Sequence, residues 1–174
     1  MEKTFSFDAE TNSLWGKPFS IAAIVYEDGI EVNRFVGRCP IEGETDSWVE
    51  ENVLPQMKGI KETHGSYDKL LADFARFYLA NKENADVIAH MCVPVESSLI
   101  KDMHDGGHIG DWDAPFPLID IAGNLQQVGE DPTSVDKYAK KNAIEVDPKD
   151  FAGGTHNPLF DSAQAAAVYH HLMK

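Results

Sequence analysis

The stretch Thr4-Phe5-Ser6-Phe7-Asp8-Ala9-Glu10-Thr11 near the N-terminus predicts the first strand of the fold. Aromatic and polar residues alternate along it, as in a β-strand with one buried face. Alternate side chains share a face, so Asp8 and Glu10 lie side by side, opposite Phe5 and Phe7. Like charges this close resist joint ionisation unless a cation lies between them, and carboxylates suit hard ions such as Mg²⁺ or Mn²⁺. The pair predicts half of a metal site, although a solvated strand end has the same pattern.

The length and composition are those of one soluble domain. The chain has 174 residues, 43% of them hydrophobic and 25% charged, so we expect a single domain spanning residues 1–174. Its two cysteines, Cys39 and Cys92, lie in different segments and indicate neither a disulfide framework nor a zinc site. The N-terminus has neither a basic region nor a long apolar run for secretion or membrane insertion, so we expect a cytoplasmic protein that does not associate with membranes.

The charge balance limits the partners that the protein can bind. A net charge of −14, from 29 acidic and 15 basic residues, argues against a long nucleic-acid interface, which needs a basic surface. It does not exclude a nuclease that holds a few nucleotides at one end. There, bound metal ions and a few basic side chains neutralise the phosphates.

The apolar pattern predicts an α/β fold with a mixed sheet. Residues 19–26 and 30–36 read as strands, and the Asp28-Gly29 step between them is typical of a hairpin, so the first three strands form an antiparallel meander. Short strands are expected at residues 86–90 and 116–121, with a surface loop at 104–113. Helices that pack on the sheet are expected at residues 48–53, 67–78, 94–103, 135–139 and from 158 to the C-terminus.

The C-terminal helix carries a carboxylate on its apolar stripe. Asp161 shares that stripe with the residues four, seven and eleven positions later, Ala165, Val168 and Leu172. The apolar members must face the sheet, so Asp161 faces it too, and an inward carboxylate needs a partner. A metal ion shared with Asp8 and Glu10 would supply one. The alternative is a carboxylate stabilised by the dipole at the helix N-terminus.

His156 lies five residues before Asp161, after two glycines. Its ordinary pKa is near neutrality, so it can accept a proton from a water molecule that attacks a substrate. The alternative is a histidine in a surface loop.

Four segments resemble, in order, the DEDDh branch of the DEDD 3′-to-5′ exonucleases, which includes oligoribonuclease, the ribonuclease T type and polymerase proofreading subunits. The first is Asp8-Ala9-Glu10-Thr11-Asn12-Ser13-Leu14, which is similar to the D-x-E-T motif with its following leucine. The last is His156-Asn157-Pro158-Leu159-Phe160-Asp161, which is similar to the H-x-x-x-x-D motif. Between them, Pro117-Leu118-Ile119-Asp120 resembles a strand ending in aspartate, and Ser134-Val135-Asp136-Lys137-Tyr138-Ala139 resembles the short helix after it. The resemblance implies a ribonuclease H-like fold, a mixed five-stranded sheet flanked by helices.

The second motif departs from the family pattern, in which an aromatic-Asp pair opens a helix after a His-Asn step. Here the segment from His90 runs His-Met-Cys-Val-Pro-Val-Glu, so the asparagine is missing, one residue is added and Glu96 stands at the position of the aspartate. Glu96 completes an acidic quartet with a longer side chain. Alternatively, it is an exposed residue in the first turn of a helix.

The resemblance implies a two-metal 3′-to-5′ exonuclease. Asp8 would bridge two Mg²⁺ or Mn²⁺ ions, Glu10 and Asp161 would hold the ion on the nucleophile side, and Glu96 would support the other. His156 would deprotonate the attacking water. The substrate would be the 3′ end of single-stranded RNA or DNA, or a short oligonucleotide, and the products nucleoside 5′-monophosphates. A homo-oligomer is compatible with the sequence. The alternative function is a catalytically degenerate domain that binds a nucleotide or a protein partner.

Thr11, Leu14 and Trp15 follow the two carboxylates of the first motif and are candidate substrate contacts. By resemblance, Thr11 would contact the terminal ribose and Leu14 would wedge against the terminal base. Trp15 has no counterpart in the motif; it would either stack on a base or anchor its loop in the core.

Two other parts of the chain are weaker candidates for a functional site. His104 and His108, with Asp111 and Asp113 after them, would suit a transition metal, but two intervening glycines favour a plain loop or lid. Cys92 would be a thiol nucleophile only with a base beside it, and a buried inert cysteine is the commoner case.

Overall fold

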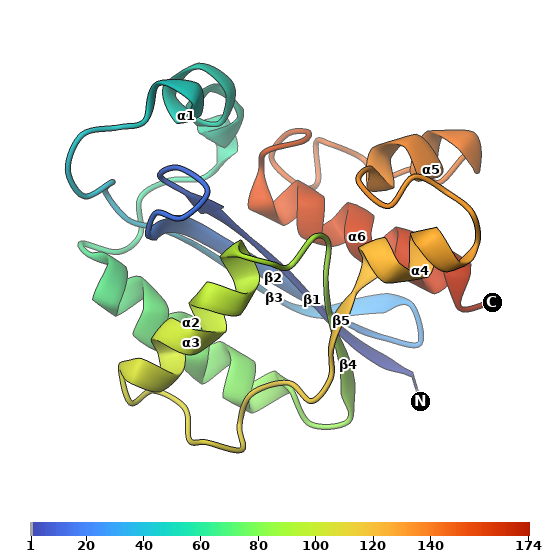
Figure 1. Ribbon diagram of the computed structural model, residues 1–174, viewed down its shortest axis with the longest axis horizontal. Coiled ribbons are helices and arrows are strands. Elements are labelled where there is room, and N and C mark those ends of the chain that lie inside the picture. The colour runs from blue at the N-terminus through green and yellow to red at the C-terminus, as the bar shows by residue number, and fades with distance from the viewer. Residues whose placement is uncertain (1) are drawn as a thin grey trace.

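The structure, a computed structural model, describes residues 2–174 and centres on a five-stranded sheet of order β3-β2-β1-β4-β5 (Figure 1). The first three strands are antiparallel, whereas β4 and β5 add in parallel to β1. This confirms the α/β class, the meander and the mixed sheet. The strand bounds are β1 Lys3–Thr11, β2 Pro18–Glu27, β3 Ile30–Arg38, β4 Ala85–Ala89 and β5 Leu118–Asp120.

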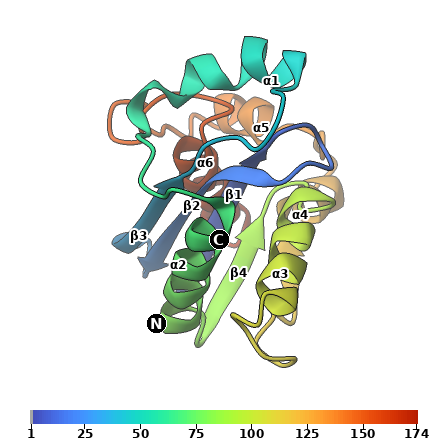
Figure 2. The same ribbon diagram turned by 90° about the vertical axis from the view of Figure 1, so that its left-hand side faces the viewer.

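Helices cover both faces of the sheet (Figures 1 and 2). Helices α2 and α3 pack on one face, and α6 packs on the other with α4 and α5 against it. Helix α1 and the 3₁₀ helix η1 lie beyond the end of β1, near the loop before α6. The helix bounds are α1 Ser47–Asn52, η1 Leu54–Gly59, α2 Tyr67–Asn81, α3 Val95–Asp105, α4 Ile121–Gln127, α5 Val135–Lys141 and α6 Pro158–Leu172.

The alternation in β1 separates two differently packed faces. Phe5 and Phe7 enter an aromatic core with α2, where the Phe7 and Phe74 ring centroids are 5.9 Å apart. On the opposite face Ser6 donates a hydrogen bond of 2.7 Å to the carbonyl oxygen of Ser162 in α6. Ser162 in turn donates to the carbonyl of Ala22 in β2. Because small residues form this face, α6 lies close against the sheet.

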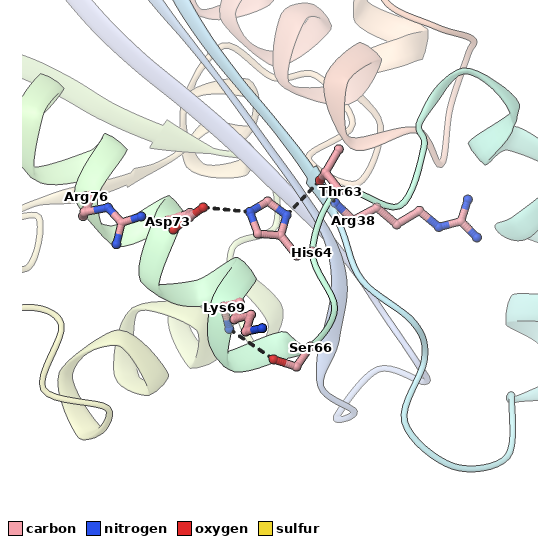
Figure 3. Close-up of polar contacts among 7 residues, drawn as sticks. All are labelled: Arg38, Thr63, His64, Ser66, Lys69, Asp73 and Arg76. Carbon is pink, nitrogen blue, oxygen red and sulfur yellow. Dashed lines mark hydrogen bonds and ion pairs between the residues drawn. The ribbon is translucent and has the colours of Figure 1, made fainter.

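A chain of polar contacts joins the end of β3 to α2 (Figure 3). Thr63 Oγ1 accepts from the backbone N–H of Arg38 and lies 2.8 Å from Nδ1 of His64. Nε2 of His64 lies 3.1 Å from Asp73, which also pairs with Arg76. If the Thr63 hydroxyl donates to Nδ1, then Nε2 carries the proton and donates to Asp73. None of these side chains lines a cavity that Glu10 lines, so their contacts serve to hold α2 in place.

The sequence analysis missed two helices and predicted one strand to be longer than it is. Helix α4 was not predicted, and the strand expected at 116–121 is shorter because Asp120 ends β5 and caps α4, accepting from the N–H of Ala122 at 2.9 Å. Helix η1 was also missed, since Pro55 limits α1 but permits a 3₁₀ turn. Within residues 2–174, no helix combines the length and the apolar character that a membrane crossing requires.

Candidate metal centre

Three carboxylates from two distant segments converge at the end of β1. One oxygen from each of Asp8, Glu10 and Asp161 lies within 4.8 Å of the others. Strand geometry brings the first two together, and α6 supplies the third from its first turn. The hydrogen bond from Ser6 to Ser162 fixes the helix against the strand next to Asp161. Asp161 therefore lies close to Asp8 and Glu10, as the sequence predicts.

Glu96 lies beside this cluster but outside the group of three. Its side chain is buried, with 3% of the residue exposed, and accepts a 3.2 Å hydrogen bond from the N–H of Ala9. β4 pairs with β1 only as far as Ser6, so Glu96 takes the place of a strand partner further along. The interpretation of Glu96 as an exposed helix residue is wrong. Its role at a second ion stays a prediction.

Burial raises the pKa of all four carboxyl groups, and repulsion within the cluster adds to the shift for Asp8 and Glu10. Burial, followed by the charges of Glu96, Asp161 and Glu10, holds the pKa of Asp8 well above its usual range. Burial and the neighbouring charges of Asp161 and Glu96 raise the pKa of Glu10 to about 8. Burial also raises the pKa of Glu96 and of Asp161 to about 7, although backbone N–H groups that bind these carboxylates oppose the shift.

The cluster lacks an internal counter-charge. In the part of the chain that the structure describes, no lysine, arginine or histidine forms an ion pair with any of the four carboxylates. Buried like charges need a compensating cation to ionise together at neutral pH. An all-oxygen donor set is the kind that hard divalent cations prefer. The residues present therefore fit a divalent metal centre.

These pKa shifts predict that pH and metal ions act together on stability. An acid with a raised pKa in the folded state binds its proton more tightly there than in the unfolded chain. The free energy of unfolding therefore falls as pH rises from the ordinary value of 4.5 towards 8. We expect the melting temperature of the metal-free protein to fall over this range, and Mg²⁺ or Mn²⁺ to raise it more at the upper end. Thermal melts at both ends, with and without metal, check this, and Glu10→Gln should flatten the pH slope. Melting that ignores both pH and metal would contradict it.

The loop before α6 holds His156 at the edge of the centre. His156 has a positive φ of 67°, and its backbone N–H donates a 2.8 Å hydrogen bond to Asp161. Asn157, fully buried, fixes the loop by donating to the carbonyls of Gln56 and Ala152, both at 3.0 Å. Burial lowers the pKa of the His156 imidazole, so the ring is mainly neutral at pH 7. The sequence analysis did not predict this positioning role for Asn157.

Two cavities meet at the carboxylates. The α1 cavity, about 430 Å³, is largely apolar and its lining includes Leu14, Trp48 and Val49. The α5 cavity, about 300 Å³, contains the carboxylates together with polar residues of the α5 region. Glu10 and His156 line both. The two cavities therefore adjoin at the edge of the acidic centre.

The expected substrate contacts differ in their placement. Thr11 and Leu14 line the α1 cavity, whereas Trp15 lines neither cavity and is 79% exposed. The interpretation of Trp15 as a core anchor is wrong; its stacking on a base stays a prediction. Trp48, which the sequence analysis did not single out, packs edge-on against His156 with ring centroids 5.3 Å apart. Only the tertiary fold brings α1 to this loop, so no local signal marked it.

The two weaker alternatives find no support. Burial and then the nearby charge of Asp120 raise the pKa of the Cys92 thiol to about 12, so it is not a ready nucleophile. His104 pairs with Asp111 at 2.9 Å on the surface. Among the described residues, the group of Asp8, Glu10 and Asp161 is the one that could hold a metal ion.

Asp120, at the end of β5, instead organises the segment that departs from the family pattern. Its carboxylate accepts from the backbone N–H groups of Met91 and Cys92 at 2.9 and 3.2 Å. His90 is held on the other side, with Nε2 2.9 Å from the carbonyl of Pro132. Both contacts fix the loop that leads into α3 and Glu96.

Comparison of the chain with protein-family models and with curated protein sequences finds no match.

Proposed function

We propose that this protein is a metal-dependent 3′-to-5′ exonuclease with a ribonuclease H-like fold, which hydrolyses single-stranded RNA or DNA to nucleoside 5′-monophosphates. One observation carries the proposal: Asp8, Glu10 and Asp161 converge, with Glu96 buried beside them and His156 at the edge. These are the residues that the resemblance to DEDDh exonucleases selects, although they lie far apart in the sequence. The antiparallel meander with two parallel strands added also supports this fold.

Asp8, Glu10 and Asp161 would hold the divalent ions, with Glu96 supporting the second. Two Mg²⁺ or Mn²⁺ ions, when bound, would supply charge stabilisation for the attacking and leaving oxygens at phosphorus. The carboxylates would position the ions in a partly enclosed site, since all four are at least partly buried. Their raised pKa values imply that ion binding displaces protons from the cluster.

His156 would accept the proton of the attacking water. Its lowered pKa keeps the imidazole neutral and therefore able to act as a base at pH 7. Water would attack the phosphorus and give its proton to His156, while the bond to the 3′ oxygen of the penultimate nucleotide breaks. The departing oxygen would take a proton from solvent and become the new 3′-hydroxyl. Trp48 packs against the imidazole and limits its rotation.

The α1 cavity would receive the terminal nucleoside. Its apolar lining suits a base, with Leu14 against the base and Thr11 near the ribose. The small footprint agrees with a net charge of −14, which disfavours a long interface with phosphates.

A nuclease assay tests the proposal directly. Single strands labelled at the 3′ or 5′ end are incubated with Mg²⁺ or Mn²⁺ and the products are identified by chromatography. We expect labelled nucleoside 5′-monophosphate from the 3′-labelled strand at the first turnover, and a ladder of shortened strands from the 5′-labelled one. Early shortening from the 5′ end, or endonucleolytic fragments, would refute the assigned polarity.

The position of Glu96 outside the group of three favours one alternative, a binding module without turnover. Such a module would bind a nucleotide in the presence of metal ions while leaving both labelled strands intact. The same assay, combined with a nucleotide-binding measurement, separates the two functions.

Substitution of Glu96 tests its support of the second ion. We expect Glu96→Gln to reduce the rate about 10- to 100-fold and to weaken metal affinity, because the amide carries no charge and binds a cation poorly. Glu96→Asp should retain or improve activity, since it restores the family's side chain. Metal titrations of the rate measure both variants. Unchanged kinetics in both would show that Glu96 only completes the hydrogen bond to Ala9.

A further inference from the structure

Gln164 is a buried polar side chain that the proposed mechanism does not use. It lies on α6 one turn after Asp161, on the same side of the helix, and lines the α5 cavity. Only 6% of the residue is exposed. Among the described side chains and backbone groups, its side-chain amide has no protein hydrogen-bond partner.

A buried amide without a partner is costly, because it has lost its hydrogen bonds to water. Among the described side chains, Nε of Arg38 is the fully enclosed polar atom that lacks a partner. The amide of Gln164 is therefore not sealed in the core and keeps contact with the cavity that it lines. Its donors and acceptor face whatever occupies that cavity.

The α5 cavity offers a further uncharged donor, the hydroxyl of Ser134. Ser134 Oγ accepts from the N–H of Lys137, which leaves its O–H free to donate. Asp136 also lines the cavity but is paired with Lys140 at 2.7 Å. Amide and hydroxyl donors suit the oxygens of a sugar and a phosphate, whereas the apolar α1 cavity suits a base.

We propose that Gln164 is a substrate-binding residue, which donates a hydrogen bond to the sugar-phosphate of the penultimate nucleotide. This inference rests on the proposed exonuclease function, and it assigns the two cavities to the two sides of the scissile bond. The terminal nucleoside occupies the α1 cavity and its phosphate lies over the carboxylates. The strand that departs with the new 3′-hydroxyl lies along Gln164 and Ser134.

Two substrates that differ only beyond the scissile bond test the inference. The p-nitrophenyl ester of thymidine 5′-monophosphate has a terminal nucleotide and a phosphodiester, but an aryl group in place of the departing strand. The variant is Gln164→Met, which keeps the length of the side chain and removes its hydrogen bonds. We expect kcat/KM to fall about tenfold on a single-stranded oligonucleotide and to stay unchanged on the ester.

A binding measurement gives a second readout. In an Asp8→Asn background, Gln164→Met should weaken oligonucleotide binding about tenfold and leave binding of thymidine 5′-monophosphate unchanged. Gln127→Met, an exposed change on α4, is the matched control and should alter neither substrate. A melting temperature close to wild type shows that Gln164→Met folds.

Each outcome decides between the alternatives. Equal losses on both substrates would place Gln164 at the terminal nucleotide or the metal centre and overturn the inference, as would wild-type kinetics on the oligonucleotide. If the wild-type protein cleaves neither substrate, the proposed function itself fails. Cleavage of both substrates by the wild type, with no difference between them in the variant, overturns the role of Gln164 alone.

Discussion

Asp8→Asn is expected to reduce phosphodiester hydrolysis to the level of a control without enzyme. Asp8 belongs to the group of three converging carboxylates and is flanked by Glu10, Glu96 and Asp161, whose charges all raise its pKa. The amide keeps the shape but loses the charge that a shared divalent ion requires. Removal of divalent ions with EDTA should have the same effect on the wild type, and added Mn²⁺ should reverse it. End-labelled strands measure both.

The stability of this variant separates a lost centre from a lost fold. Because Asp8→Asn removes one of several repelling buried charges, the metal-free variant should melt at or above the wild-type temperature. A gain of about 1 kcal/mol would raise it by about 2–4 °C. Asp68→Asn, an exposed change on α2, is the matched control and should retain full activity. Undiminished hydrolysis in excess EDTA would overturn the two-metal mechanism.

His156→Ala is expected to lower kcat by about 10² to 10⁴, the usual contribution of a general base. The loop would remain, since Asn157 holds it through Gln56 and Ala152. Metal affinity should therefore persist. Single-turnover rates at saturating Mn²⁺ measure the chemical step, and metal titration measures the centre.

The pH dependence gives His156 its own signature. Burial lowers the pKa of the imidazole below its ordinary 6.5, so the wild-type rate should fall only at pH values below that. At saturating metal the rate of His156→Ala should no longer fall at low pH, so the acidic limb of the pH profile should be lost. His104→Ala, a surface histidine paired with Asp111, should keep both the limb and the rate. Wild-type turnover in His156→Ala would return His156 to the role of a loop residue.

The fold was largely predictable because its main elements carry clear periodicities. The alternation in β1 assigned Asp8 and Glu10 to one face, and the helical stripe on α6 assigned Asp161 to the sheet. Both inferences need only local geometry. Helix α4 escaped prediction because Asp120 is at once the end of a strand and a helix cap, and a sequence pattern indicates such a boundary poorly.

The sequence analysis did not single out two residues of the site, Trp48 and Gln164. Trp48 reaches His156 only because α1 lies beside the loop before α6, and no spacing in the sequence expresses that contact. Gln164 was overlooked for another reason. The stripe on α6 was traced through apolar residues and Asp161, so a neutral amide on the same side carried no signal. Glu96 was found through family resemblance, and its burial needed the structure.

The contact between Ser6 of β1 and Ser162 of α6 makes the position of Asp161 depend on how closely the helix packs on the sheet. Ser6 and Ser162 leave little room between helix and strand, and Ala163 and Ala166 on the same helix are almost fully buried. Close-packed interiors transmit an added methyl group as a shift of the whole element. Here that shift would carry Asp161 away from Asp8 and Glu10, and a displacement of about 1 Å can cost about 10²-fold in rate. Larger side chains at the buried alanines of α6 would therefore abolish function before they unfold the protein.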